Sequence, residues 1–195
     1  ALRKSRLDTN VVCFIITRRP TVSILPEALE TRSMLRELRD VCSRITHDMS
    51  GALFRTAAER FADAIADGAP IALAMIDIDH FKRIYDGHGH AAGDAALRRL
   101  AQIMDAVLPE SVLTARFGGE EFCSLAVGAT ADEAHALFDE LRVAVERDPP
   151  VYGGTALPMT LSVGVALFDH RDLDDSINRA DRLLYEAKRA GRNRV

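Results

Sequence analysis

Residues 71–76 (Ile-Ala-Leu-Ala-Met-Ile) are all apolar, and this run constrains the fold more than any other part of the sequence. A continuous apolar run of this length, without alternation, is typical of a strand that is covered on both faces. The run ends in Asp77-Ile78-Asp79. Because an ionised carboxylate is costly to bury without a partner, we expect both acids to be paired where this central strand ends.

A second acidic group follows two consecutive glycines. Residues 112–117 and 122–127 each have the composition of a strand, and Gly118-Gly119 between them would supply the positive-φ dipeptide of a tight hairpin turn. Glu120 and Glu121 then lie at or just beyond the hairpin tip, where adjacent carboxylates suit a hard cation. The same pattern also fits an ordinary polar hairpin with solvated glutamates.

The position of this hairpin in the sheet decides whether the two acidic groups meet. If the strand before the hairpin lies beside residues 71–76, Asp77 and Glu120 can bind the same cation.

The segment after the central strand has features of a phosphate site. Lys82 follows the acidic cluster, and residues 87–94 form a predicted glycine-punctuated loop that leads into an amphipathic helix at residues 95–108. A cationic side chain, a loop rich in glycine and a helix N-terminus near carboxylates favour a metal-bound polyphosphate.

The remaining elements complete the order strand, helix, strand, strand, helix, strand. A helix is predicted at residues 131–147, a strand at 159–168 and a final helix at 174–189. This order predicts an α+β fold of the ferredoxin-like βαββαβ type.

The chain before this domain divides into two parts. Residues 1–25 are an N-terminal extension to which no role is assigned. Residues 26–49 are predicted to form a helical stalk, because apolar residues recur at alternating steps of three and four, as in a short coiled coil. A helix packed on its own domain fits the same spacing. We therefore expect an extension, a dimerising stalk and a domain at residues 50–195.

Composition excludes several kinds of partner. The net charge of −4 disfavours nucleic-acid polymers, so small nucleotides are the favoured partners. Residues 11–16, the longest apolar run near the start, are too short to span a bilayer. Three cysteines without metal-ligand spacing fit a reducing compartment. We expect a cytoplasmic protein without membrane contact through this fragment.

Taken together, the motifs resemble the GGDEF domain of bacterial diguanylate cyclases, here as Gly118-Gly119-Glu120-Glu121-Phe122. The resemblance runs over residues 50–195 and includes residues 160–166 and the closing Gly191-Arg192-Asn193. It implies a palm-type domain, similar to that of polymerases and nucleotidyl cyclases. It also implies that a homodimer condenses two GTP into cyclic di-GMP and two pyrophosphate.

The resemblance implies roles for individual residues. Two Mg²⁺ ions, with Mn²⁺ as an alternative, would be bound by Asp77, the backbone carbonyl of Ile78 and Glu120. Catalysis would use Glu120, Glu121 and Lys82. The residues implied to contact the nucleotide are Phe81, Lys82, Tyr85, His90, Asp94, Lys188 and Arg192.

Three residues depart from the family pattern. Tyr85 stands where the family has an Asn that binds guanine, and a phenol cannot copy both the donor and the acceptor of an amide, so we expect weakened or altered base recognition. His47 and Phe54 replace an acid and an amide in the turn after the stalk. Two alternatives therefore stay open: a catalytically weak or inactive GGDEF domain that binds nucleotide and regulates a partner, and a cyclase with relaxed base choice.

Overall fold

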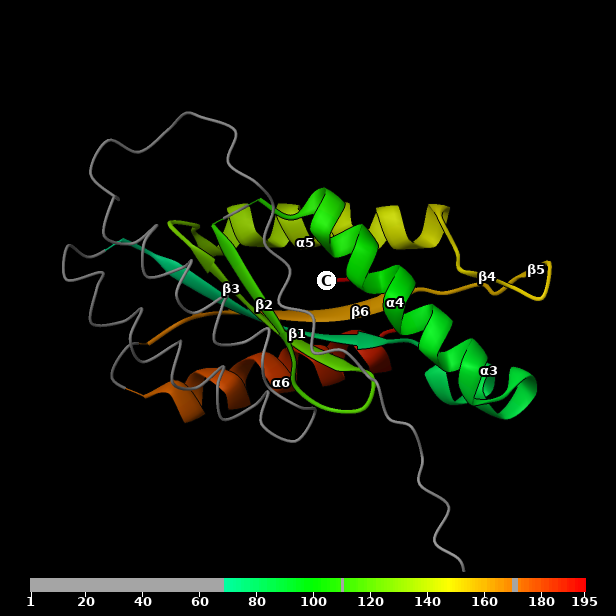
Figure 1. The fold of residues 1–195 in the computed structure, drawn as a ribbon. Coiled ribbons are helices and arrows are strands. Elements are labelled where there is room, and N and C mark those ends of the chain that lie inside the picture. The colour runs from blue at the N-terminus through cyan, green and yellow to red at the C-terminus, as the bar shows by residue number, and fades with distance from the viewer. Residues whose placement is uncertain (1–68, 110, 170–171) are drawn as a thin grey trace, which may run out of the picture.

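The domain is built on a four-stranded antiparallel sheet with strand order β2-β3-β1-β6 (Figure 1). The computed structural model describes residues 69–109, 111–169 and 172–195. The strands are β1 (Ile71–Ile78), β2 (Val112–Arg116), β3 (Glu121–Val127) and β6 (Leu161–Leu167). Their order and direction are those of a ferredoxin-like sheet, so the predicted α+β, βαββαβ fold class is confirmed. The predicted extension, the stalk and the turn with His47 and Phe54 lie outside the described residues.

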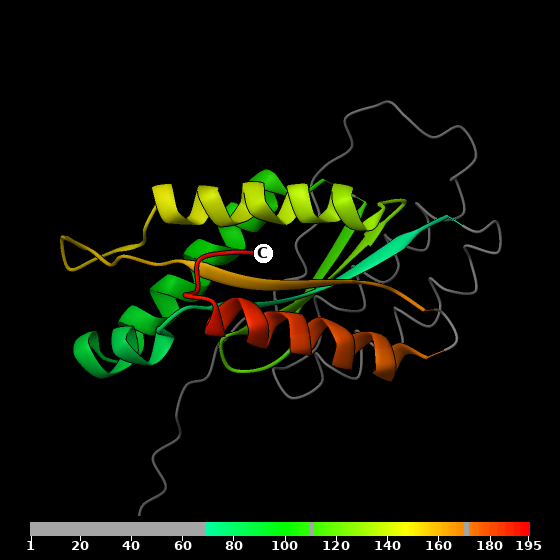
Figure 2. The ribbon, with the colours of Figure 1, turned by 180° about the vertical axis from the view of Figure 1, so that it is seen from behind.

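Helices cover both faces of this sheet (Figures 1 and 2). The four described helices are α3 (Phe81–His88), α4 (His90–Val107), α5 (Ala131–Arg147) and α6 (Leu173–Arg189). The two opposite views agree that α4 and α5 lie on one face and α6 on the other. Within the described ranges, none of the helices is long and apolar enough to cross a membrane.

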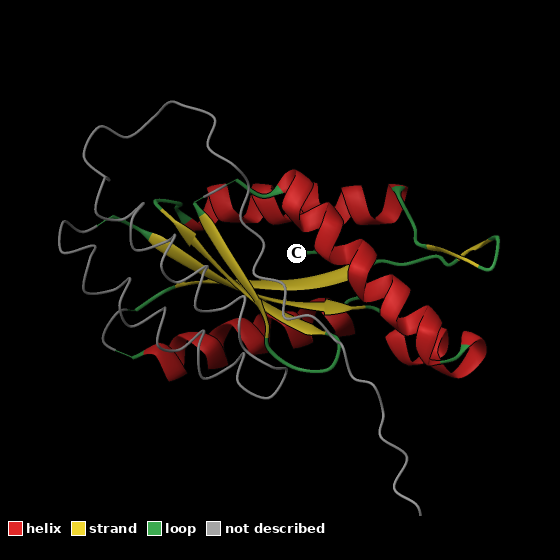
Figure 3. Cartoon of the chain, in the orientation of Figure 1, coloured by secondary structure: helices red, strands yellow, loops and turns green. Residues whose placement is uncertain are grey.

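A small hairpin that the sequence did not predict extends beyond α5 (Figure 3). It pairs β4 (Val151–Tyr152) with β5 (Thr155–Ala156), and two positive-φ glycines between these strands, Gly153 and Gly154, form its turn.

Strand β1 separates two hydrophobic cores. All eight of its residues are buried. Ala74 and Ile76 belong to the core that includes α4 and α5, whereas Leu73 and Met75 belong to the core that includes α6. The continuous apolar run in the sequence therefore reflects burial on both faces of a central strand, as predicted.

The predicted loop at residues 87–94 is wrong, because these residues are almost entirely helical. Helix α3 continues to His88 and α4 starts at His90, so only Gly89, with φ 81°, interrupts the two helices. The alanines of this segment favour helix. Gly93 serves close packing instead of flexibility, since a Cβ at this position would lie 2.8 Å from Cδ2 of Tyr85.

Helix α5 begins with a capping box. The hydroxyl of Thr130 accepts from the backbone N–H of Glu133, and the Glu133 carboxylate accepts from the backbone N–H of Thr130. We expect Thr130→Ala to lower the free energy of unfolding by about 1 kcal/mol, and thus Tm by about 2–4 °C, because it leaves an N-terminal amide without its acceptor. Thermal unfolding measures this change. Thr130→Ser keeps the hydroxyl and should unfold at the original temperature; equal losses in both variants would contradict the capping role.

Candidate active site

The carboxylates of β1 and of the hairpin meet at one end of the sheet. In the register of β1 and β3, Asp77 lies directly opposite Glu121. Of the two hairpin strands, the one that lies beside β1 is thus β3, which follows the hairpin tip. The sequence had made a shared cation depend on the strand before the tip, β2, lying beside β1, and β2 does not lie there. The acidic groups still meet, because the hairpin returns its tip to the end of β1.

Asp77 is the most buried carboxylate of this group, with 6% of the residue exposed. Its Oδ2 forms an ion pair of 2.8 Å with Nζ of Lys188, which α6 carries from the far end of the sequence. Burial raises the pKa of the Asp77 carboxyl, and the Lys188 ammonium opposes this rise. The negative charges of Glu120 and Glu121 raise the Asp77 pKa further. The site therefore concentrates negative charge, and Lys188 offsets part of it.

The hairpin tip is wider than the predicted two-residue turn. Neither Gly118 nor Gly119 has a positive φ, so the prediction of a positive-φ dipeptide is wrong. The backbone N–H of Phe117 donates to the carbonyl of Glu121 at 2.8 Å, and this longer loop does not need the left-handed region. The Arg116 guanidinium closes the loop by donating to the carbonyls of Gly118 and Gly119 at 3.2 and 2.9 Å.

A second group of predicted residues lies on α3 and α4. Lys82 is exposed and forms an ion pair with Asp86 at 3.2 Å, one helical turn along α3. Phe81 packs into the hydrophobic core with 8% of the residue exposed. Asp94 lies inside α4, which begins at His90, so it does not cap this helix.

Tyr85 links the two helices. Its hydroxyl forms a hydrogen bond with Nδ1 of His90, and the two ring centroids are 4.2 Å apart at an interplanar angle of 69°. The Tyr85 ring is half-buried against the core and also lies near the Phe81 ring, at 6.1 Å between centroids. The residue that departs from the family pattern thus already has partners for both its ring and its hydroxyl.

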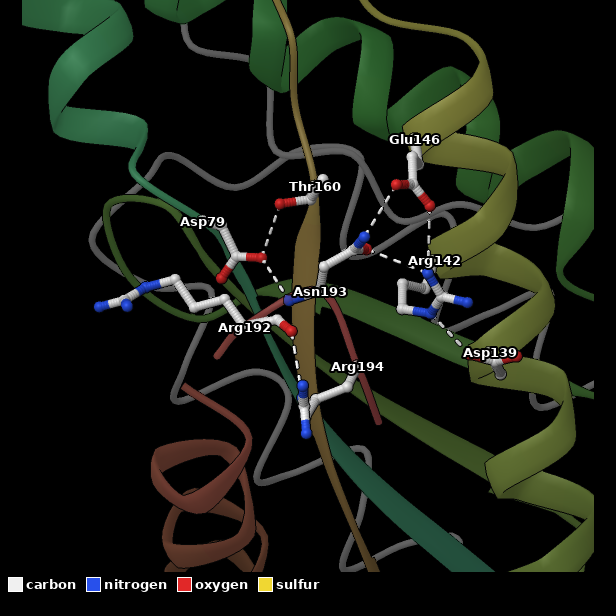
Figure 4. A network of polar contacts seen from close by, with 8 residues as sticks. All are labelled: Asp79, Asp139, Arg142, Glu146, Thr160, Arg192, Asn193 and Arg194. Carbon is white, nitrogen blue, oxygen red and sulfur yellow. Dashed lines mark hydrogen bonds and ion pairs between the residues drawn. The ribbon is translucent and has the colours of Figure 1, made fainter. Parts of the chain in front are cut away.

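Asp79 is a buried carboxylate that the sequence left without a role beyond needing a partner. Only 4% of the residue is exposed. It accepts hydrogen bonds from Thr160 Oγ1 at 2.8 Å, Ser162 Oγ at 2.7 Å and the backbone N–H of Asn193 at 3.0 Å (Figure 4). Thr160-Leu161-Ser162, two hydroxyls with period-two spacing on a predicted strand, was the sequence signal that could have indicated these partners.

Arg192 lies just beyond α6, in the segment that reaches Asp79. Its backbone is left-handed, with φ 66°, and its side chain is half-buried. In Figure 4 this side chain extends away from the Asn193 side chain and from α5. The structure thus groups Asp77, Glu120, Glu121 and Lys188, and it joins Tyr85 to His90 as a separate pair.

The donor set at the sheet end fits a hard divalent cation. Asp77, Glu120 and the Ile78 carbonyl offer only oxygen atoms, which Mg²⁺ and Mn²⁺ accept. Across residues 69–109, 111–169 and 172–195, no three or more His, Cys, Asp or Glu side chains form a metal-binding group. The predicted ligand set consists of two carboxylates and a main-chain carbonyl oxygen, so it does not need three such side chains.

The fold and the acidic sheet end define a palm-type α+β domain. The chain belongs to the GGDEF family: the family model described as "Diguanylate cyclase, GGDEF domain" matches residues 50–194.

Individual relatives agree with this assignment. The chain is 38% identical over 157 residues to diguanylate cyclase DgcP of Pseudomonas aeruginosa, covering 77% of this chain and 23% of DgcP. The GGDEF domain of DgcB from Caulobacter crescentus, solved in complex with c-di-GMP, superposes with a TM-score of 0.69 at 31% identity, over 78% of this chain and 97% of that one. The active GGEEF domain of a Vibrio cholerae diguanylate cyclase gives a TM-score of 0.65 at 34% identity, over 76% and 94%. This chain spans less than half the length of the curated relatives it matches.

Proposed function

We propose that this chain is the catalytic domain of a diguanylate cyclase, which condenses two GTP into cyclic di-GMP and two pyrophosphate. The observation that carries the proposal is the pairing of Asp77 with Glu121 across β1 and β3, with Lys188 bound to Asp77. Three carboxylates and an ammonium at one end of a sheet suit a nucleoside triphosphate with its cations. The names of the relatives support the same activity.

The cation ligands in this proposal are Asp77, the Ile78 carbonyl and Glu120. When bound, Mg²⁺ or Mn²⁺ would neutralise the triphosphate and polarise its phosphorus–oxygen bonds. Burial raises the pKa of the Asp77 carboxyl, and the charges of Glu120 and Glu121 raise it further. A cation at this end of the sheet would favour the ionised form of Asp77 and offset these effects. The number of ions, two by resemblance, is part of the proposal.

The remaining roles belong to protein side chains. Glu120, supported by Glu121, would accept the proton of the attacking 3′-hydroxyl. That oxygen forms a bond to the α-phosphorus of the second GTP, and the bond to pyrophosphate breaks. Lys82, Lys188 and Arg192 would neutralise the phosphates and the leaving group.

Contacts to the guanosine would come from α3 and α4. The residues proposed to contact it are Phe81, Tyr85, His90 and Asp94. Because the Phe81 side chain lies in the core, its contribution would come from its backbone.

The reaction requires a homodimer, because each domain presents one GTP and two must react with each other. The stalk at residues 26–49 would hold the two copies together. The expected setting is the cytoplasm, without nucleic-acid polymers or membrane contact as partners of this fragment.

Turnover at different protein concentrations tests this proposal. With Mg²⁺ and GTP, cyclic di-GMP formation per mole of protein should rise with protein concentration and then level off as the dimer fills. Removal of the divalent ion with a chelator should stop it. Turnover that is independent of both protein concentration and divalent ion would contradict the proposal.

Base selection gives a separate prediction. Tyr85→Asn should increase the preference for GTP over ATP by roughly tenfold to a hundredfold, because an amide offers guanine both a donor and an acceptor. Steady-state kinetics with each nucleotide measure this preference. Tyr85→Phe removes only the hydroxyl bonded to His90, so it should not gain the preference. If Tyr85→Asn leaves the preference unchanged, Tyr85 does not occupy a guanine-reading position.

The contact of Tyr85 with His90 also favours the alternative of a nucleotide-binding domain that regulates a partner, because both side chains are engaged with each other. That alternative predicts GTP binding without product. The relaxed-specificity alternative predicts dinucleotides that contain adenine when ATP is also present.

A further inference from the structure

The segment after α6 has an unusual backbone. The N–H of Arg192 donates to the carbonyl of Ala187 at 3.0 Å, and Gly191 has φ 116°, which together form a Schellman-type helix end. Arg192 and Asn193 then continue in the left-handed region, with φ 66° and 49°. Two consecutive non-glycine residues in this region cost free energy, so contacts elsewhere must hold them there.

Arg194 pairs with β6, where its carbonyl accepts from the Val163 N–H at 2.9 Å, and the remaining contacts of this segment converge on Asn193 (Figure 4). Its backbone N–H donates to Asp79 Oδ2 at 3.0 Å. Its side-chain Oδ1 accepts from Arg142 Nη1 at 3.0 Å, and its Nδ2 donates to Glu146 Oε1 at 2.9 Å. One residue thus joins the end of β1 to helix α5.

The α5 side of this connection is itself fixed. Arg142 donates to Asp139 at 2.6 Å and to Glu146 at 3.2 Å, and only 15% of its side chain is exposed. The α5 residues therefore present a defined donor and acceptor to Asn193.

The connection from Asp79 through Asn193 to α5 lies next to two proposed site residues, Arg192 and Ile78. Arg192 directly precedes Asn193, and Asp79 directly follows Ile78, whose carbonyl is a proposed cation ligand. In Figure 4 the Arg192 side chain extends to the opposite side from the α5 contacts of Asn193. The peptide between Arg192 and Asn193 is held at both of its polar atoms: its N–H donates to Asp79, and its carbonyl accepts from Arg194 Nε at 3.1 Å. The side chain of Asn193 adds an anchor to α5 on the other side of this peptide, and the backbone so fixed sets the direction in which the Arg192 side chain leaves it.

We propose that Asn193 is a positioning residue: its side-chain contacts with Arg142 and Glu146 hold Arg192 in the direction that binds the nucleotide phosphates. This role rests on the proposed function, because it assigns Arg192 to the triphosphate. In this role, Asp139, Arg142 and Glu146 of α5 act on the substrate site through Asn193.

A double-mutant cycle tests this role. The probe is a GTP analogue with a non-hydrolysable α,β-bridge, and its affinity is measured with Mg²⁺ by calorimetry. Asn193→Gly keeps the left-handed backbone accessible but removes both side-chain contacts, and should weaken binding by about tenfold. Arg192→Ala should weaken it by a similar factor. If Asn193 acts through Arg192, the double variant should bind as weakly as Arg192→Ala alone.

A charge exchange tests the contact itself. Asn193→Asp puts a carboxylate against Glu146 and should lower the affinity, whereas adding Glu146→Gln restores a donor opposite that carboxylate and should recover it. Additive losses in the double-mutant cycle, or no recovery in the exchanged pair, would overturn the positioning role. Failure of the unsubstituted chain to bind the analogue would instead contradict the proposed function on which this role rests.

Discussion

Glu120→Gln is expected to lower cyclic di-GMP formation by a factor of about 10²–10³ without lowering Tm. The substitution keeps the size of the side chain but removes a negative charge from a cation ligand and from the group that accepts the 3′-hydroxyl proton. Glu120 is only half-buried on the hairpin tip and forms no part of either hydrophobic core, so the fold should not depend on it.

Initial rates and thermal unfolding of the same preparation measure both effects. Glu140→Gln is the matched control, because it makes the same chemical change at an exposed position of α5. It should leave both the rate and Tm unchanged. Near-normal turnover by Glu120→Gln would contradict the role of the hairpin carboxylate.

Gly164→Ala is expected to cause the largest loss of stability. Gly164 lies in β6 opposite Met75, where the backbone of α6 passes directly over the sheet. A Cβ at this position would collide with the Ala180 carbonyl oxygen and the Leu184 backbone nitrogen. Because the obstruction is main chain, no side-chain rotation can relieve it. We expect a loss of about 3 kcal/mol or more and a fall in Tm of roughly 6–12 °C.

Thermal and denaturant unfolding measure this loss. Gly119→Ala is the matched control, since no atom lies within 4 Å of a Cβ there and its φ is not positive. Its Tm should be that of the original chain. If the two variants have the same Tm, α6 does not approach β6 as closely as the structure indicates.

The sheet was largely predictable because its hydrophobic pattern leaves few alternatives. The unbroken apolar run of β1 required cover on two faces, and α6 and the α4–α5 layer provide it. The element order predicted the ferredoxin-like class, but the sequence did not determine which hairpin strand lies beside β1; that strand is β3. The β4–β5 hairpin was missed because two-residue strands carry no usable periodicity.

Two predictions of local structure that were based on glycines are wrong. At residues 87–94 they indicated a loop, yet Gly93 allows α4 to pack closely on Tyr85 of α3. At the hairpin they indicated a positive-φ turn, yet the Arg116 guanidinium closes a longer loop. In the first case the packing of one helix on another, and in the second a side-chain contact within the loop itself, accompanies the backbone conformation, and composition reveals neither.

The acidic group of the candidate site could be proposed from the sequence, whereas several of its contacts could not. Asp77 and the two glutamates were recognisable as an acidic group, and the register brings Asp77 opposite Glu121. The ion pair of Asp77 with Lys188 joins residues 111 positions apart in the sequence (188 minus 77), and no local pattern predicts it. No local pattern predicts the link from Asp79 through Asn193 to α5 either, because its residues come from three separate segments of the chain.

The identity of the product is the most direct test of the proposed cyclase activity. The purified chain is incubated with Mg²⁺ and GTP, and in parallel with equal amounts of GTP and ATP, and the nucleotides formed are identified by mass spectrometry. The proposed cyclase activity predicts cyclic di-GMP and pyrophosphate in a ratio of one to two from GTP alone, with cyclic di-GMP still the main product when ATP is present. Bound GTP that is recovered unchanged, with no cyclic dinucleotide formed at any protein concentration, would contradict it.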